Sequence, residues 1–290
     1  PDYNNNSYSK ATSIQKFNNA TKGLFELGSV FKILNVAIGL ETGVTAIRKK
    51  YNVSNPIKIS KFRIKDDHHF DGYLNTSEIL VLSSNIGSAK IAEEIGIKKQ
   101  KKYFKNLGLL DFPKLKLPEI STPSLPKNWE KTELMTISFG HGIAVTPLHA
   151  ASSISTASSH GYFINPTLKR IEQNEIIKKS KVFSLDTVSK IRTMMRLVVS
   201  HPKGTANKAE TTGYLVGAKT GTAEKIKNSA YDKNANLVSL VASFPIHSPE
   251  YLIFITIDHP KKIKNIPRTT AGHVIAPIIP NIINQIAPIL

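Results

Sequence analysis

The order of apolar and polar positions predicts a helical first two thirds of the chain and a strand-rich last third. Apolar residues recur at helical spacing in five segments, four of which are followed by a glycine stop signal. Thr146 and Pro147 supply the cap and first position of one of them. The predicted helices are Ser29–Leu40, Ser77–Ile95, Lys98–Leu107, the segment from Pro147 to about 160, and Leu185–Val199.

Two stretches between these helices lack helical periodicity. Residues 44–75 mix basic, Pro, Asp and His residues and are expected to form loops or short strands. Residues 111–131 contain four prolines, which favours an extended loop.

The pattern changes after Gly213. Tyr214–Ala218, Leu237–Phe244 and Tyr251–Asp258 are rich in β-forming residues and are separated by polar or Pro-containing turns. We predict three successive antiparallel strands, with a C-terminal helix over about 270–287 covering them. A helical body followed by a meander indicates an α+β fold.

The amino-acid composition narrows the range of possible functions. With 40% hydrophobic and 21% charged residues, the 290-residue chain is expected to fold, and the absence of Cys excludes disulfides, thiolate metal sites and thiol nucleophiles. The net charge of +18 permits an anionic partner. However, 33 of the 39 basic residues are Lys, whereas nucleic-acid recognition favours Arg. We predict no nucleic-acid partner, no metal and no cofactor.

The first candidate for chemistry is Ser29-Val30-Phe31-Lys32. Residues three apart share a helix face, so a neutral Lys32 can accept the Ser29 proton and make it a nucleophile. Free Lys titrates near pH 10.4, so this role requires burial or a nearby cation. Ser-x-x-Lys occurs five times in the chain, but only Ser29 has a preceding Gly and an apolar helix behind it. An ordinary surface Ser remains the alternative.

Two further motifs are each found once. In Ser83-Ser84-Asn85, a hydroxyl and an amide two residues apart can relay a proton and hold a peptide carbonyl, although the pair also suits a helix cap. Lys219-Thr220-Gly221-Thr222 follows a predicted strand and offers a charge and two hydroxyls for a carboxylate. Its alternative is a polar turn after the strand.

Together, the three motifs and their order resemble the class B penicillin-binding proteins, which are D,D-transpeptidases of cell-wall synthesis. The resemblance covers essentially all 290 residues and is closest to the cell-division (septal) branch. The flanking segments that support it are Glu26-Leu27-Gly28, Ser83–Gly87, Gly140–Leu148, Gly213-Tyr214 and Gly217–Lys225. One departure is Leu27, where the family usually has Pro.

The resemblance implies a catalytic role for five residues. Ser29 would attack the penultimate D-Ala of a stem peptide, with Lys32 as general base. Ser83 and Asn85 would relay protons and hold the acyl donor. Lys219 would supply positive charge that helps keep Lys32 neutral.

It also implies a substrate-binding strand. Thr220, Gly221 and Thr222 would bind the donor, whose carboxylate contacts the two Thr hydroxyls, and the backbone N–H groups of Ser29 and Thr222 would form an oxyanion hole. The donor would pair with this strand by β-addition.

The implied partners are peptidoglycan stem peptides, β-lactams as covalent inhibitors, and divisome proteins including a membrane glycosyltransferase. The implied location is the periplasmic face of the inner membrane. No segment of the chain approaches the ~20 apolar residues of a membrane span. The family's membrane anchor, pedestal domain and first sheet strand are expected to be missing from this chain, so the sheet is expected to have an unpaired edge or gap. We expect one transpeptidase domain over 1–290, with a helical subdomain over about 33–205 against a sheet subdomain over about 206–290.

Other functions remain open at this point. A serine β-lactamase would need a deacylating base, and the class A Glu-x-x-Leu-Asn element is absent, while class D has Val where this chain has Asn85. A D,D-carboxypeptidase would use water as acceptor, and a non-catalytic remnant would keep only the fold. The acidic and His-rich segment 66–71 resembles a metal cluster, but the related family has a similar segment without metal.

Overall fold

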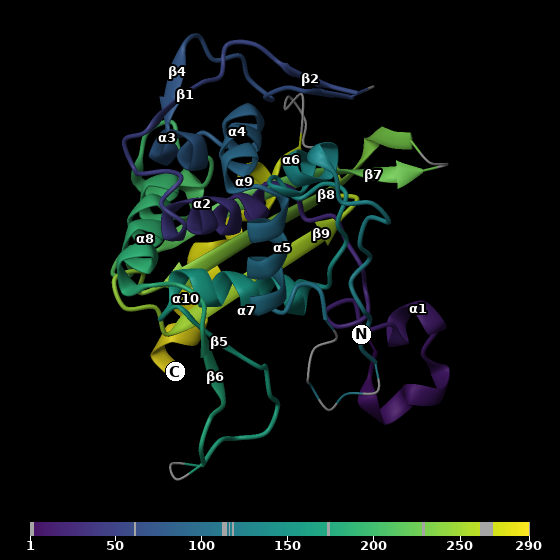
Figure 1. Ribbon diagram of the computed structural model, residues 1–290. Helices are drawn as coiled ribbons and strands as arrows, with labels where there is room; N and C mark the ends of the chain where they lie inside the picture. The colour runs from purple at the N-terminus through teal and green to yellow at the C-terminus, as the bar shows by residue number, and fades with distance from the viewer. Residues whose placement is uncertain are drawn as a thin grey trace.

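The computed structural model describes residues 3–60, 62–111, 115, 117, 119–172, 175–227, 230–261 and 269–289, with the side chains of 225–235 left aside. Its helices pack around a central helix and against one antiparallel sheet, as Figure 1 shows, so the predicted α+β class is confirmed. The α-helices are α1 (Ser13–Lys16), α2 (Lys32–Glu41), α3 (Thr76–Val81), α4 (Asn85–Ile95), α5 (Ile97–Asn106), α6 (Lys131–Ile137), α7 (Pro147–Ser158), α8 (Leu185–Ser200), α9 (Ala271–Val274) and α10 (Ile279–Ile286).

Short 3₁₀ turns extend several of these helices, and the strands fall into small hairpins and one larger sheet. The 3₁₀ turns are η1 (Asn5–Lys10), η2 (Gly28–Phe31), η3 (Asn207–Ala209), η4 (Ala276–Ile278) and η5 (Ala287–Ile289). The strands are β1 (Lys50–Asn52), β2 (Ile57–Ile59), β3 (Phe62–Ile64), β4 (Tyr73–Asn75), β5 (Tyr162–Ile164), β6 (Lys179–Lys181), β7 (Gly217–Lys227), β8 (Ala230–Phe244) and β9 (Tyr251–Asp258).

Helix α2 is the centre of the helical body. Every residue from Lys32 to Gly39 is buried, because α2 contacts α3, α4, α5, α7 and α8 on different sides. A helix that is surrounded in this way must be apolar on all faces. This explains the run of Ile, Leu, Val and Ala, and it makes the buried Lys32 at its first position exceptional.

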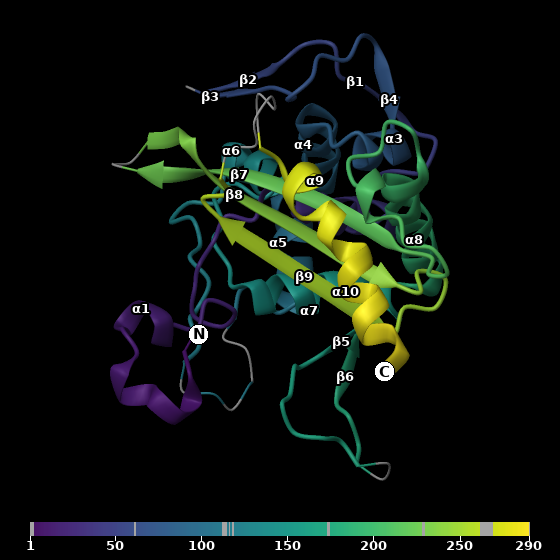
Figure 2. The same cartoon turned by 180° about the vertical axis from the view of Figure 1, so that it is seen from behind.

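The sheet has the antiparallel order β7-β8-β9. Its central strand β8 is buried on both faces from Leu237 to Phe244, whereas β9 is half-buried over most of its length. Along β8, Leu237 and Val241 join the core of the helical body, whereas Val238 and Leu240 join a second core with α8, α9 and α10. Figure 2 shows α10 crossing one face of the sheet. Strand alternation therefore decides which side chains of the sheet face α2.

Two predicted helices are wrong in extent. The predicted helix Ser77–Ile95 is split into α3 and α4, because Ser83 adopts a left-handed backbone conformation with φ of 64°. The predicted helix over 270–287 is divided into α9, η4 and α10. Pro277 and Pro280 lie at the starts of η4 and α10, since Pro lacks the N–H that would continue a helix.

The predicted strand Tyr214–Ala218 is also wrong. The backbone turns at Gly213, where Tyr214 N donates to Thr211 O at 3.1 Å, and β7 begins at Gly217. Pairing with the central strand β8 then carries β7 through polar residues to Lys227. Sheet pairing here overrides weak β-propensity. Strand β9, by contrast, has the predicted bounds.

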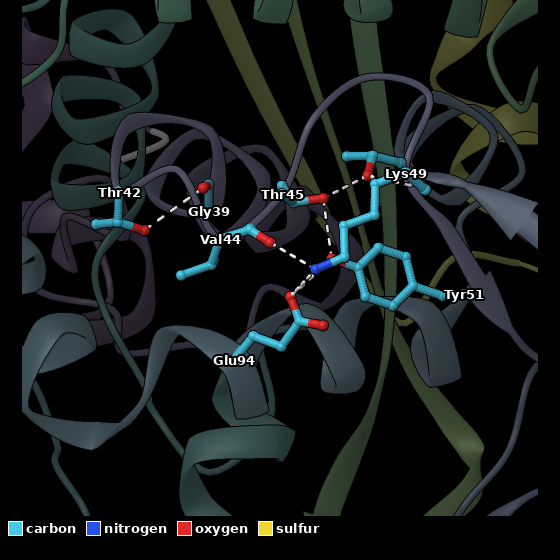
Figure 3. A network of polar contacts seen from close by, with 8 residues as sticks. Gly39, Thr42, Val44, Thr45, Lys49, Tyr51 and Glu94 are labelled. Atoms are coloured by element: carbon cyan, nitrogen blue, oxygen red, sulfur yellow. Dashed lines mark hydrogen bonds and ion pairs between the residues drawn. The ribbon is translucent and has the colours of Figure 1, made fainter.

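A polar network joins the two-stranded β1–β4 sheet to the helical body (Figure 3). Lys49 Nζ donates to Glu94 Oε2 at 2.7 Å and to Val44 O at 2.7 Å, and Tyr51 donates to Thr45 Oγ1 at 2.9 Å. These contacts connect β1, the segment after α2, and α4. Because β4 pairs with β1, the network also holds the β4 end of the segment between β3 and β4, and this segment reaches the start of α4.

None of the helices in the described ranges is long and apolar enough to cross a membrane. The division into subdomains at about 33–205 and 206–290, and the missing first sheet strand, stay predictions.

Candidate active site

Ser29 and Lys32 meet at the start of the buried helix α2. Ser29 lies in the 3₁₀ turn η2, and Lys32 is the first residue of α2. Lys32 Nζ donates to Ser29 Oγ at 2.8 Å, and the Lys32 side chain is fully buried. The amine and hydroxyl are therefore in direct contact; the amine is shielded from bulk water, whereas Ser29 is half-buried.

The link between α3 and α4 surrounds the other side of the Lys32 amine. Lys32 Nζ donates to Ser83 O at 2.6 Å and to Asn85 Oδ1 at 2.7 Å, and Ser83 Oγ lies 3.2 Å away. The positive φ of Ser83 directs both its carbonyl and its hydroxyl toward Lys32. Asn85 also donates from Nδ2 to Lys65 O at 3.0 Å, so both ends of its amide are held.

Strand β7 brings Lys219 to the same place. Lys219 pairs with Val241, which faces the helical body, so alternation points the Lys219 side chain toward α2. Its Nζ donates to Ser83 Oγ at 2.9 Å and to Thr220 O at 2.9 Å. The structure thus gathers Ser29, Lys32, Ser83, Asn85 and Lys219 in one contact network, in which Ser83 Oγ bridges the two amines.

Burial and mutual repulsion govern the protonation of this pair of amines. Burial lowers the pKa of Lys32 to about 7, although the negative charges of Asp66 and Asp67 act to raise it. The pKa of Lys219 lies well below its usual range, first because of burial and then because of the neighbouring Lys32. The pair therefore resists carrying two protons at neutral pH. Because the pKa of Lys219 is itself lowered, its role as the positively charged partner stays a prediction.

The backbone of β7 runs directly against the Ser29 turn. A Cβ on Gly28, where φ is 63°, would lie 2.7 Å from Thr222 O, and a Cβ on Gly221 would lie 2.4 Å from Leu27 O. Both positions require Gly because backbone meets backbone. This approach brings the turn that contains Ser29 against β7 at Thr222, and an oxyanion hole formed by the N–H groups of Ser29 and Thr222 stays a prediction.

The two Thr residues of β7 project from the opposite face to Lys219. Thr220 pairs with Leu240 and donates from Oγ1 to Thr205 Oγ1 at 2.7 Å, while Thr222 is half-buried. Thr205 was missed by the sequence analysis, since no motif or periodicity marks it. Carboxylate binding by the two hydroxyls stays a prediction.

The two ends of the polar segment 66–71 lie in different surroundings. Asp66 contacts the start of α4, whereas His69 Nε2 and Asp71 Oδ1 form an exposed pair 2.8 Å apart. Within the described ranges, no group of three or more His, Asp or Glu residues is arranged to hold a metal ion. Asp66 is a second residue whose position the sequence did not reveal.

Known proteins resemble both the sequence and the fold of this chain. It is 34% identical over 298 aligned residues to the probable peptidoglycan D,D-transpeptidase FtsI of Caulobacter vibrioides, covering 100% of this chain and 51% of that protein. It is 30% identical to the probable peptidoglycan D,D-transpeptidase PenA of Neisseria meningitidis, covering 90% and 44%. The chain therefore spans about half the length of the curated relatives it matches.

A solved structure agrees with these relatives. The transpeptidase domain of Burkholderia pseudomallei penicillin-binding protein 3 superposes with a TM-score of 0.86 at 28% identity, covering 94% of this chain and 82% of that one. Residues 1–284 match the penicillin binding protein transpeptidase domain. These matches confirm the class B resemblance and its FtsI-like branch. The chain belongs to the penicillin-binding protein transpeptidase family.

Proposed function

We propose that this chain is the catalytic domain of a peptidoglycan D,D-transpeptidase that cross-links stem peptides in septal cell-wall synthesis. The observation that carries the proposal is the fully buried Lys32 amine, 2.8 Å from Ser29 Oγ and bridged to Lys219 through Ser83. A buried amine with a pKa of about 7 is partly neutral at neutral pH, as a general base must be.

In the first half-reaction, Lys32 takes the Ser29 proton as Ser29 Oγ bonds to the carbonyl carbon of the penultimate D-Ala. The amide C–N bond then breaks, and the departing terminal D-Ala amine receives a proton through Lys32 or the bridging Ser83. An acyl-enzyme ester remains on Ser29. In the second half-reaction, the amine of another stem peptide attacks this ester, the new amide forms, and Ser29 regains its proton.

The remaining residues bind and polarise the donor in this proposal. The N–H groups of Ser29 and Thr222 stabilise the negative oxygen of each tetrahedral intermediate. Thr220 and Thr222 receive the donor carboxylate, and the backbone of β7 pairs with the extended peptide. Asn85 is held by Lys32 and Lys65, so its first contribution is to orient the Lys32 amine.

The whole protein's setting is also proposed by family resemblance. We place the domain at the periplasmic face of the inner membrane, with septal proteins as partners, including a membrane glycosyltransferase. β-Lactams resemble the D-Ala-D-Ala terminus and would acylate Ser29 as covalent inhibitors.

Incubation with a fluorescent penicillin tests the function. We expect one stable covalent adduct, located by peptide mass spectrometry at Ser29, because a transpeptidase without an acceptor amine retains its acyl group. Rapid release of hydrolysed penicillin would instead indicate a serine β-lactamase. A folded protein that forms no adduct would indicate a non-catalytic member of the fold. Incubation with a D-Ala-D-Ala peptide, with and without an acceptor amine, separates transpeptidation from carboxypeptidation.

The acylation rate is expected to depend on pH through Lys32. Since the base must be neutral, the second-order rate constant should fall about tenfold per pH unit below the Lys32 pKa and level off above it. The midpoint is expected near the Lys32 pKa of about 7. Stopped-flow measurement with a penicillin over about pH 5 to 9 checks this. A rate that stays constant over that range would contradict Lys32 as the base.

A further inference from the structure

Asp66 binds the first turn of helix α4 from a different part of the chain. Its Oδ1 accepts from Asn85 N and from Ile86 N, the latter at 3.0 Å, and its Oδ2 accepts from Ser84 Oγ at 2.7 Å. The carboxylate thus receives three hydrogen bonds. Because the N-terminus of a helix carries partial positive charge, an anion at this place is stabilised electrostatically as well.

Asp66 works together with the cap residue of the same helix. Ser84 Oγ accepts from Gly87 N at 2.9 Å, so Ser84 and Asp66 between them satisfy the first three N–H groups of α4. Lys65, which precedes Asp66, holds the Asn85 side chain, since Lys65 O accepts from Asn85 Nδ2 at 3.0 Å. Residues 65 and 66 therefore fix both the backbone and the amide of Asn85.

This contact lies next to the strained residue of the site. Ser83 has a φ of 64°, a conformation that non-Gly residues adopt at an energetic cost and that persists only where neighbouring structure enforces it. On its N-terminal side, the last turn of α3 holds the chain, since Leu82 N donates to Glu78 O at 2.8 Å. On its C-terminal side, Asp66 holds the start of α4. Ser83 thus lies between two fixed helix ends.

We infer that Asp66 is a positioning residue for the general base, which holds Ser83 and Asn85 in place so that their three oxygen atoms direct the Lys32 amine toward Ser29. The inference rests on the proposed function of Ser29 and Lys32. It connects the segment after β3 to the active site through the hydrogen bonds of Asp66, which is not part of any of the three motifs.

The charge of Asp66 has a second consequence. Lys32 is faced by Lys219 from β7 and by Asp66 and Asp67 from the segment after β3, while the α3–α4 link presents neutral groups. Both carboxylates raise the pKa of Lys32 against the effect of burial. Asp66 therefore keeps the Lys32 pKa from falling further, in addition to orienting its amine.

Two variants separate these roles. Asp66→Asn retains an oxygen for the Asn85 and Ile86 N–H groups but removes the charge, whereas Asp66→Ala removes the cap. Asp71→Asn is the matched control, because Asp71 lies in the same segment and its side chain is exposed. The penicillin acylation rate is measured against pH for all three, together with melting temperature.

For Asp66→Asn we expect the acid limb of the rate profile to move to lower pH by about half a unit or more, with the plateau nearly unchanged. For Asp66→Ala we expect a plateau of the acylation rate about tenfold lower. A tenfold loss corresponds to a free-energy cost in the range found for removal of a strong helix cap. Asp71→Asn should match the native protein. An unmoved limb in Asp66→Asn and an unchanged plateau in Asp66→Ala would overturn the inference.

Hydrogen exchange provides a readout that does not depend on catalysis. The amides of residues 85–87 are expected to exchange faster in Asp66→Ala than in the native protein, beyond any change in global stability. If the native protein is not acylated, the proposed function fails and the positioning role is judged on this exchange alone. If the native protein is acylated and both the rates and the exchange of the variants are native-like, only the inference fails.

Discussion

Replacing Ser29 with alanine is expected to abolish covalent labelling by a fluorescent penicillin. The acyl bond forms at Ser29 Oγ, and no other hydroxyl in the described contacts of the site can replace it at that position. Ser83 Oγ, the nearest candidate, already accepts hydrogen bonds from both buried amines. Labelling should fall to the background seen with denatured protein, and gel fluorescence against total protein measures it.

The chain offers a matched control for this change. Ser200 is also followed by Lys three residues later, but it lies at the exposed end of α8, where its hydroxyl donates to Arg196 O at 3.1 Å. Ser200→Ala should label like the native protein. Persistent labelling of a correctly folded Ser29→Ala protein would show that another residue is the nucleophile.

Replacing Lys32 with methionine is expected to lower the acylation rate about a thousandfold, within the range that a general base contributes. Methionine has a similar length and is apolar, so it suits a fully buried position at the start of α2. It can neither accept the Ser29 proton nor donate to Ser83 O and Asn85 Oδ1. The residual rate should also lose the acid limb near pH 7 that the native protein shows.

Melting temperature and a second variant distinguish chemistry from folding. Lys203 is the exposed Lys of the Ser-x-x-Lys sequence that begins at Ser200, so Lys203→Met controls for the loss of one positive charge. If Lys32→Met melts near the native temperature but acylates slowly without pH dependence, the base is identified. A native-like rate and pH profile in the folded variant would exclude Lys32 from that role.

The elements that were predicted well have strong local signals. The Thr146 cap and Pro147 mark the start of α7, where Thr146 Oγ1 accepts from His149 N at 3.3 Å. The apolar runs of α2 and α8 reflect faces that are buried in the structure, and the apolar run of β9 belongs to a strand that is half-buried over most of its length. These segments carry enough burial and capping information in their own residues to define their type.

The elements that were wrongly predicted depend on contacts outside their own residues. The break at Ser83 follows a helical pattern that runs without interruption through both α3 and α4, and a positive φ at a Ser has no composition signal. The polar half of β7 becomes a strand because β8 pairs with it. The partners of Ser83 are far away in the sequence, whereas the polar end of β7 pairs with the next strand, as close as Lys227 with Ala230.

Local patterns in the chain were sufficient to predict the fold class and the family resemblance, because periodicity, caps and short motifs depend on neighbouring residues. Three contacts could be found only in the folded molecule: Ser83 Oγ between Lys32 and Lys219, the Thr220 hydroxyl on Thr205, and the Asp66 carboxylate at the start of α4. Hydrogen bonds and burial between distant segments depend on distances in space, which the spacing of residues along the chain does not encode. The lowered pKa values of the two Lys residues belong to that second group, since burial is a property of the folded body.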